Sequence, residues 1–173
     1  MNVGATAPEE YGSYFAWGET EEKDEYSWAN YTHSNGTYDT CTDIGDDIAG
    51  KTVYDAATAN LGSDWQMPTW NQFTELVENT TNTWTTQNGV NGWLFTAESN
   101  GNSIFLPAAG ERTDVLDYAG VEGSYWTSTL YKEVQYINWA YDFNFNSSGI
   151  TTEYAFNRNT GLPIRPVRKL VHP

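Results

Sequence analysis

The stretch Met67-Pro68-Thr69-Trp70-Asn71-Gln72-Phe73-Thr74-Glu75-Leu76-Val77-Glu78-Asn79 carries the clearest secondary-structure signal in the chain. Thr69 and Gln72 have the spacing of a capping box, in which each side chain bonds the backbone amide of the other at a helix start. The apolar positions that follow recur with the spacing of one helix face, at Phe73, Leu76 and Val77. The sequence therefore predicts a helix that begins at Thr69 and ends near Asn79.

A second short helix is predicted from Thr52 to Asn60, with Gly62 just beyond its end. Its buried positions would be Val53, Ala56 and Ala57. The other apolar segments are short, aromatic and bounded by Asn, Gly or Pro, which is typical of strands; they are Trp93–Phe95, Ser103–Leu106, Tyr125–Thr129 and Ile164–Val167. Two short helices with short antiparallel strands and long loops indicate an α+β fold. The polar stretch from Glu19 to Asp47 is predicted to be extended loop.

Composition indicates a folded single domain over residues 1–173. Aromatic residues make up 16% of the chain, whereas acidic disordered chains are poor in them. The formal net charge of -15 disfavours nucleic acids and anionic membranes as partners. No apolar run approaches the roughly 20 residues of a membrane span, so no insertion into a membrane by this domain is expected. With Cys41 as the only cysteine, no intrachain disulfide can form.

The C-terminal third has an unusual composition between Tyr131 and Arg158. Its residues alternate, and we expect Ala140, Phe143 and Phe145 to point inward, with a small shift between the first two. The intervening residues, which include Asp142, would face outward or lie at an irregularity. Tyr and Trp provide rigid contact area and Asn provides adaptable hydrogen bonds, as in an antibody combining site. An ordinary β-rich core is the alternative.

The candidate ligand-binding residues are those of this third that would project from such a face. Its aromatic members would anchor a ligand, and its Asn and Asp members would set hydrogen-bond specificity. They are Tyr131, Tyr136, Trp139, Tyr141, Asp142, Asn144, Tyr154, Phe156, Asn157 and Asn159.

The sequence contains no pattern that predicts a catalytic residue, a cofactor or a metal ligand. There is no Ser-His-Asp arrangement, phosphate-binding glycine loop or zinc spacing. Acidic residues from Glu19 to Glu25 and from Asp43 to Asp47 could offer oxygen ligands to calcium, but a solvated acidic loop fits their spacing better. Arg165 and Arg168 are expected to pair with buried acids and so to be structural.

Several segments, in the same order along the chain, resemble the Fibrobacter succinogenes major paralogous domain family of bacterial surface proteins. The resemblance covers nearly the whole chain. The segments are Asn2–Gly12, Tyr14–Thr20, Asp55–Asn60, Trp65–Thr69, Asn102–Gly110, Gly123–Ser128 and Gly161–Arg168. The family is similar to the formylglycine-generating-enzyme branch of the C-type-lectin-like fold, which is the fold that the resemblance implies here.

The resemblance implies a binding domain displayed outside the cell, on a cell surface or a virion. Family members occur in lipoproteins, pilus tips and phage proteins of Bacteroidetes and Fibrobacter, and the implied partner is a protein or glycan on another cell or host surface. In some members a diversity-generating retroelement mutates adenines in a C-terminal repeat. The products of such mutation, which include Asn, Tyr, Asp, Ser and Phe, are abundant from Tyr131 to Asn159.

This chain departs from the family and its relatives in ways that bear on function. The enzymatic branch uses two cysteines and iron-dependent relatives use three histidines, whereas this chain has Cys41 alone and two histidines, His33 and His172. We therefore expect no enzyme. A family strand that usually precedes Asn2 is missing, which suggests a trimmed N-terminus, and Gln66 stands where Arg is usual. The alternatives are a structural or assembly module of a pilus, surface lipoprotein or phage tail and, more remotely, a glycan hydrolase with two facing carboxylates.

Overall fold

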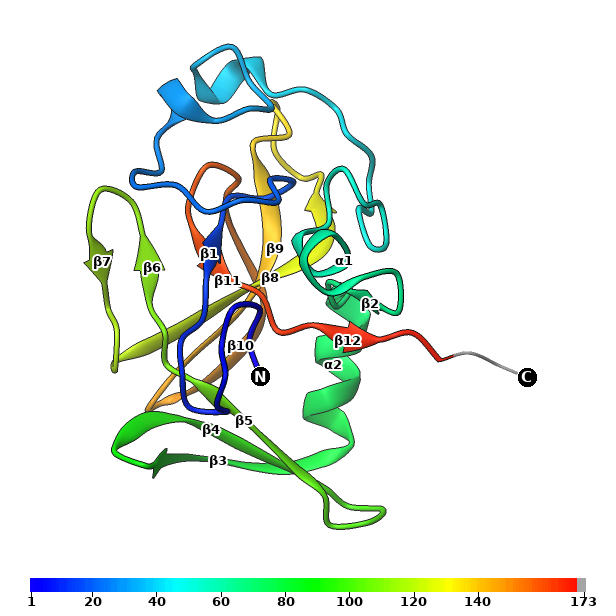
Figure 1. Cartoon of the computed structure of the whole chain (residues 1–173), viewed down its shortest axis with the longest axis vertical. Coiled ribbons are helices and arrows are strands. Elements are labelled where there is room, and N and C mark those ends of the chain that lie inside the picture. Colours follow the sequence, from blue (N-terminus) through cyan, green and yellow to red (C-terminus); the bar gives the residue numbers. More distant parts are fainter. Residues whose placement is uncertain (171–173) are drawn as a thin grey trace.

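The computed structural model describes residues 1–170, so His172 lies outside the described residues. The fold is of the α+β class and combines two α-helices with short antiparallel strands in several small sheets (Figure 1). The strands are β1 (Tyr14–Phe15), β2 (Trp65–Gln66), β3 (Thr80–Gln87), β4 (Val90–Ala97), β5 (Ser103–Pro107), β6 (Glu111–Arg112), β7 (Leu116–Asp117), β8 (Glu122–Tyr131), β9 (Trp139–Asn146), β10 (Gly149–Asn157), β11 (Leu162–Pro163) and β12 (Val167–Arg168). The helices are α1 (Ala56–Leu61) and α2 (Trp70–Glu78), and two 3-10 turns are η1 (Trp28–Asn30) and η2 (Tyr38–Thr40).

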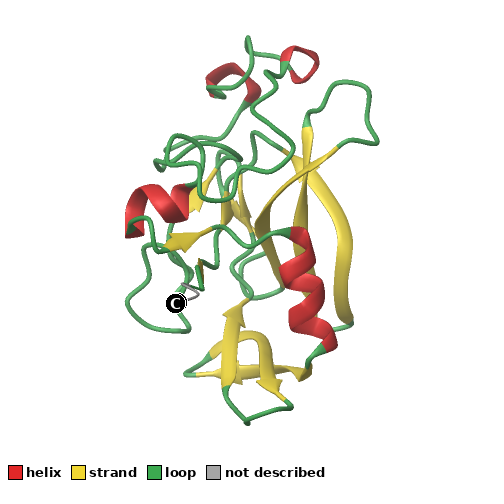
Figure 2. Ribbon diagram, turned by 90° about the vertical axis from the view of Figure 1, so that its right-hand side faces the viewer, coloured by secondary structure: helices red, strands yellow, loops and turns green. Residues whose placement is uncertain are grey.

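The central element is the antiparallel sheet β10-β9-β8, and its middle strand is buried on both faces. Alternate residues of a strand point to opposite faces. Phe143 and Phe145 belong to a core cluster with Phe73 of α2, which runs along the sheet (Figure 2). Ala140 belongs instead to a second cluster with Trp17 and other N-terminal residues.

The prediction that Ala140 shares an inward face with Phe143 and Phe145 was therefore wrong. The extra residues lie in the neighbouring strands, in β8 between Trp126 and Leu130 and in β10 between Thr151 and Tyr154, and not in β9. Because β9 is continuous, residues 140 and 143 must point to opposite faces. Each face of the sheet packs against its own core cluster, so no single set of alternate residues in β9 points inward.

The predicted helix at Thr69 is confirmed. Its first residue is Trp70, and the Thr69 side chain accepts a hydrogen bond from the Gln72 amide at 3.2 Å. The Gln72 side chain accepts one from the Thr69 amide at 2.9 Å, which completes the capping box. Phe73 is buried, and Leu76 and Val77 pack against the same cluster.

The other helix begins later than predicted. α1 starts at Ala56 because the Asp55 carboxylate accepts hydrogen bonds from the amides of Ala57 and Thr58, and so acts as the N-cap. The same carboxylate accepts from Gly50 and Met67, which binds three segments together. Val53 precedes this cap and is 72% exposed, so its assignment to the buried stripe was wrong.

The strand predictions were confirmed for Trp93–Phe95, Ser103–Leu106 and Tyr125–Thr129, which lie in β4, β5 and β8. A continuous strand over Ile164–Val167 was wrong. β11 ends at Pro163 and pairs with β1, whereas β12 begins at Val167 and pairs with β2. The chain changes sheets between them, and Pro166 has no amide hydrogen with which to continue a ladder. β3 was not predicted, because its residues are mostly Thr and Asn.

The polar stretch from Glu19 to Asp47 is mostly loop, interrupted by η1 and η2. It is held to the body of the domain by two buried tyrosines. The Tyr26 hydroxyl donates to the Tyr14 carbonyl, and the Tyr31 hydroxyl donates to the Trp17 carbonyl. A small β6-β7 hairpin lies beside this region, where Arg112 exchanges backbone bonds with Gly161.

Candidate functional site

The candidate site lies at the end of the β8-β9-β10 sheet where β8 ends and β9 begins. Tyr131 of β8 and Asn157 of β10 are both paired with Trp139 of β9, so the three residues share a face. Tyr141 lies two residues along β9 on that face, opposite Ala155. The strand register therefore brings together four of the residues that the sequence predicted.

The exposed aromatic rings form a connected group, which we call the aromatic face: Trp70, Tyr131, Trp139 and Tyr141. The Tyr131 ring centroid is 5.9 Å from that of Trp139 and 5.1 Å from that of Tyr141. The Trp70 ring lies 5.5 Å from the ring of Tyr141. All four side chains are partly exposed, so their rings are held by one another and still reach the surface.

Both indole nitrogens of the aromatic face are used inside the protein. Trp139 Nε1 donates to Asn157 Oδ1 at 2.9 Å, and Trp70 Nε1 donates to the Thr152 carbonyl. The rings are thereby fixed in orientation, and what they offer to a ligand is apolar ring surface. Asn157 serves as a support for Trp139 in this arrangement.

Trp70 was missed by the sequence analysis. It is the first residue of α2 and lies far from the C-terminal third in sequence, so no local pattern linked it to that region. The available signal was indirect. The capping box fixes Trp70 as the first residue of α2. Because α2 packs on the sheet, the side chain of this residue reaches Tyr141.

A hollow of about 270 Å³ adjoins the aromatic face, lined by Tyr131, Trp139, Glu153, Tyr154 and Ala155. Its surroundings are negative. Burial raises the pKa of Tyr141, with further contributions from Tyr131, Glu133 and Glu153. The nearby Lys132 makes an ion pair of 2.8 Å with Asp46. The hollow therefore suits a neutral or cationic group.

Two predicted residues of β10 differ in their surroundings. Tyr154 is 45% exposed and reaches the hollow. Phe156 lies opposite Ala140 and packs against the core cluster that contains Ala140 and Leu130. Their rings are 6.2 Å apart. Phe156 is thus mainly a core residue, whereas Tyr154 belongs to the surface of the site.

Asp142 and Asn159 are buried, so their prediction as exposed ligand-binding residues was wrong. Asp142 has no exposed surface because β9 has a core on both faces and this residue shares the face of Ala140. Neither of its carboxylate oxygens has a hydrogen-bond partner in the described chain. Burial raises its pKa well above the ordinary range, and the carboxylates of Glu111 and Glu122 add to the rise.

The last two predicted residues lie away from the aromatic face. Asn144 is on the opposite face of β9, where its Nδ2 donates to Ser124 Oγ at 2.8 Å. Tyr136 lies on the loop between β8 and β9, and its ring packs 5.6 Å from that of Tyr38. The ten predicted residues therefore divide into surface members, supporting members and core members.

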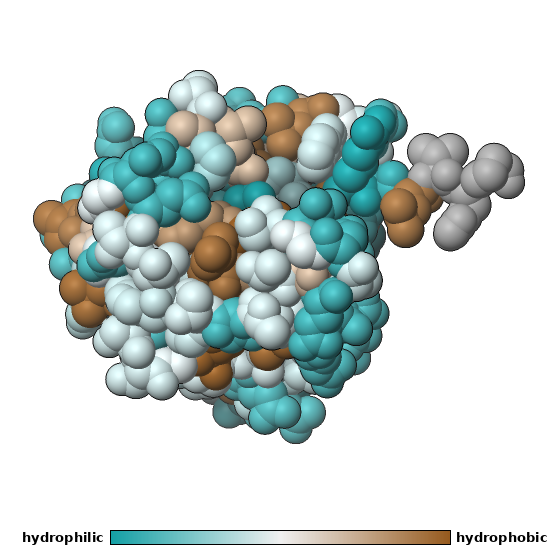
Figure 3. Space-filling model, turned by 90° about the horizontal axis from the view of Figure 1, so that it is seen from below, coloured by the Kyte–Doolittle hydropathy of each residue, from teal (hydrophilic) through white to brown (hydrophobic). Residues whose placement is uncertain are grey.

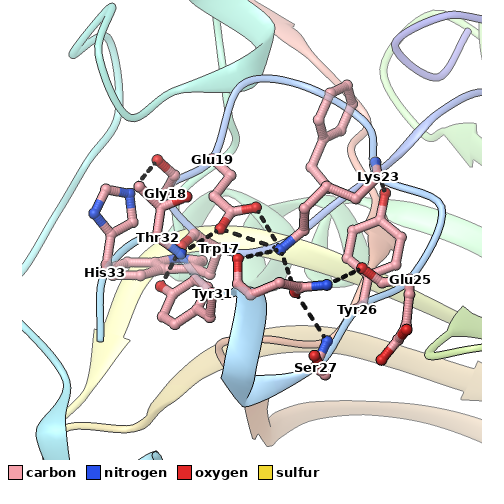
Figure 4. A network of polar contacts seen from close by, with 12 residues as sticks. Trp17, Gly18, Glu19, Lys23, Glu25, Tyr26, Ser27, Tyr31, Thr32 and His33 are labelled. Carbon is pink, nitrogen blue, oxygen red and sulfur yellow. Dashed lines mark hydrogen bonds and ion pairs between the residues drawn. The ribbon is translucent and has the colours of Figure 1, made fainter. Parts of the chain in front are cut away.

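The acidic loop that begins at Glu19 is more ordered than predicted. Glu19 forms an ion pair of 2.9 Å with Lys23, and it accepts a hydrogen bond of 2.8 Å from the Thr32 amide (Figure 4). His33 Nε2 bonds the Gly18 carbonyl at 2.8 Å, and burial lowers the pKa of this histidine. These residues border a hollow of about 250 Å³, but the hydrogen-bonding groups of Glu19 are already paired.

The two arginines near the C-terminus do not pair with buried acids, contrary to the prediction. Arg168 is 3.9 Å from Asp64, and both side chains are largely exposed. Arg165 makes no ion pair with a described residue. Neither arginine therefore has a buried acidic partner among the described residues.

No three His, Cys, Asp or Glu side chains gather closely enough to hold a metal ion among residues 1–170. In the same residues, no helix is long and apolar enough to cross a membrane. At the end of the molecule formed by β3 and β4, hydrophobic residues are interspersed with hydrophilic ones (Figure 3).

Comparisons with protein-family models, with curated proteins and with solved structures found no match for this chain.

Proposed function

We propose that this chain is a non-catalytic ligand-recognition domain that contacts a protein or glycan through its aromatic face. The observation that carries the proposal is the connected group of partly exposed rings on one sheet face, with both indole nitrogens bonded internally. Ring surfaces held in this way lose little conformational entropy when a partner covers them. Large aromatic side chains of this kind are the commonest anchors of binding energy in interfaces.

The charges around the aromatic face limit the class of partner that it can bind. Glu133, Glu153 and a net charge of -15 repel an anionic ligand, and the nearby Lys132 is paired with Asp46. A glycan partner would therefore be neutral, with its apolar ring faces against the aromatic rings. A protein partner would present a neutral or basic surface.

We further propose that the chain has the C-type-lectin-like fold of the Fibrobacter succinogenes major paralogous domain family. In support, the segments that carry the resemblance meet in the core. β1 pairs with β11, the Trp126 indole donates to the Phe15 carbonyl at 2.7 Å, and the Trp17 indole donates to the Thr127 carbonyl at 2.9 Å. The order of these segments along the chain would then reflect a fold that the chain shares with the family.

The proposed family membership also implies where the domain is displayed and how its binding residues vary. The domain would be displayed on a cell surface or virion, and its partner would lie on another cell or host surface. Retroelement mutation from Tyr131 to Asn159 would vary the surface members Tyr131, Trp139, Tyr141 and Tyr154. Changes at the buried Asp142 and Asn159 would instead affect stability.

The test is a binding screen with matched variants. Wild type is applied to an array of neutral glycans and to a panel of purified cell-surface proteins, beside a variant that combines Tyr131→Ser, Trp139→Ser and Tyr141→Ser. The control combines Tyr118→Ser and Val121→Ser, two exposed residues outside the aromatic face. For any partner found, we expect the triple variant to bind at least about tenfold more weakly, and the control to bind like wild type.

Size-exclusion chromatography of the same proteins separates recognition from assembly. A stable wild-type oligomer that the triple variant converts to monomer would favour an assembly module and overturn the proposed ligand face. Equal binding by wild type and the folded triple variant would also overturn it. Turnover of an arrayed glycan would overturn the non-catalytic assignment.

A further inference from the structure

Arg165 lies between β11 and β12, at the junction of two hollows. The larger has a volume of about 520 Å³ and is bordered by α2, the ends of β4 and β5, and β12. The smaller, of about 310 Å³, lies beside Asn2 and Trp65. Only Arg165 and Pro166 border both, so the arginine side chain has open space on two sides.

The guanidinium of Arg165 is poorly compensated. Its five N–H groups make one hydrogen bond, from Nη1 to the Phe105 carbonyl at 3.1 Å. No described acidic residue forms an ion pair with it, and burial lowers its pKa. A partly buried charge that has no ionic partner and several free donors is suited to receive an anion.

Arg158 shows how this protein compensates a buried guanidinium when the charge is structural. Arg158 donates to Tyr31 Oη, to the Ile137 carbonyl and to the Thr42 carbonyl, at 2.9 to 3.0 Å. Its guanidinium also lies over two aromatic rings. Arg165 has neither three acceptors nor a stacked ring within the described chain.

The unpaired nitrogens of Arg165 are accessible. Nε and Nη2 make no hydrogen bond to a described residue, yet neither is among the unpartnered polar atoms that are closed off from solvent. Both therefore keep contact with solvent, in a residue that borders the two hollows. Adjacent N–H groups on these two atoms match the two oxygens of a carboxylate.

The larger hollow supplies an apolar surface next to this donor pair. Phe73, Leu76, Ile104 and Val167 contribute to its lining, and its size is that of a small-molecule site. One carboxylate, that of Glu75, also borders this hollow, but the C-terminal segment beside it is richer in positive charge than the rest of the chain. Three of the eight basic residues, Arg165, Arg168 and Lys169, fall within five positions of a protein with a net charge of -15.

We propose that Arg165 binds the carboxylate of a small molecule whose apolar body occupies the larger hollow. The guanidinium supplies a paired contact to the two oxygens, and the lining from α2, β5 and β12 covers the hydrocarbon. An inorganic anion would satisfy the arginine and leave the apolar lining exposed to water. An uncharged hydrocarbon would cover the lining and leave the arginine unpaired.

Three probes separate these contributions: octanoate has both parts, octanol has the chain without the charge, and acetate has the charge without the chain. Each is titrated into ¹⁵N-labelled protein and followed by nuclear magnetic resonance. We expect octanoate to shift the amide signals of Leu76, Ile104 and Val167 and the side-chain Nε signal of Arg165. At equal concentrations, octanol and acetate should shift them much less.

The variants are Arg165→Met, Arg165→Lys and the control Lys132→Met, whose side chain is 59% exposed in the native protein and borders neither hollow. Loss of a charge-assisted contact should weaken octanoate binding by about tenfold to a hundredfold in Arg165→Met. Arg165→Lys should recover part of the affinity, and Lys132→Met should stay within about twofold of wild type.

Equal binding of octanoate and octanol would overturn the proposal, as would equal weakening by Arg165→Met and Lys132→Met. Acetate that binds as well as octanoate would reduce the site to an adventitious ion only. If Arg165→Met does not fold, the wild-type Arg165 Nε signal decides the question, because no shift with octanoate would overturn the proposed contact.

Discussion

The guanidinium carbon of Arg158 lies 4.9 Å from the centroid of the Trp17 indole ring, and both side chains are fully buried. The Tyr31 ring lies 5.6 Å from the same carbon, so the charge is enclosed by two aromatic rings. Because Arg158 also donates to carbonyls of Thr42 and Ile137, one side chain connects the N-terminal loop and the β8–β9 loop to the core.

Replacement of Arg158 with Lys should lower the free energy of unfolding by about 2 to 4 kcal/mol, because an ammonium group cannot reproduce the planar set of contacts. Urea unfolding followed by tryptophan fluorescence measures the change. Arg168→Lys, at an exposed position, should change it by less than about 0.5 kcal/mol. Similar effects of the two substitutions would contradict the role given to Arg158.

Replacement of Asp142 with Asn should stabilise the protein at neutral pH. The folded-state pKa of Asp142 is raised by burial, so the folded state holds its proton more tightly than the unfolded state does. Stability from this group is therefore greatest below the unfolded-state pKa of about 3.9 and is lost as pH rises toward the folded-state pKa.

Thermal unfolding of Asp142→Asn and wild type at several pH values tests this sign. The variant should have the higher melting temperature at pH 7.5, by an amount that corresponds to on the order of 1 kcal/mol or more, and the difference should shrink toward pH 4. Asp24→Asn, at an exposed position, serves as the control. A difference that does not vary with pH would contradict the assignment.

Replacement of Gly123 with Ala should destabilise the sheet. An added Cβ atom would clash with the Phe145 ring, and the ring cannot withdraw easily because it packs between Tyr125 and Phe143. Overpacking of this kind costs about 1 to 3 kcal/mol. Chemical denaturation measures the loss, and Thr151→Ala on the exposed side of β10 should cost much less.

Replacement of Thr69 with Ala should cost about 1 kcal/mol of stability, because the Gln72 amide loses its capping acceptor. Thr69→Ser keeps a hydroxyl and should retain most of the stability. Urea unfolding compares the three proteins. Because Trp70 begins the same helix, Thr69→Ala should also weaken the binding of any ligand to the aromatic face. Unchanged stability of this variant would contradict the capping role.

Local patterns predicted those features whose causes are local. The α2 helix was predicted correctly because the capping box and the apolar stripe both lie within its own residues. α1 was placed too early because the N-cap at Asp55 also depends on contacts with Gly50 and Met67, which the local pattern does not contain. β3 was missed because its Thr and Asn residues show no apolar alternation.

The candidate site was predicted in part for the same reason. Aromatic composition pointed to Tyr131, Trp139, Tyr141 and Tyr154, all of which reach the surface. It could not separate these from Asp142, because period-2 alternation does not reveal that both faces of a strand are covered. Trp70 joins the group only through the packing of α2 on the sheet.

The amino-acid sequence by itself determined the α+β class, the start of α2, the acidic surface and the concentration of aromatic residues in the C-terminal third. Tertiary structure alone decided which of those aromatics are exposed, that Asp142 is enclosed, and that Arg165 lacks an acidic partner. Propensity, capping and charge depend on near neighbours in sequence. Burial and pairing depend on segments about a hundred residues apart, such as Trp17 and Thr127, that only the complete fold brings into contact.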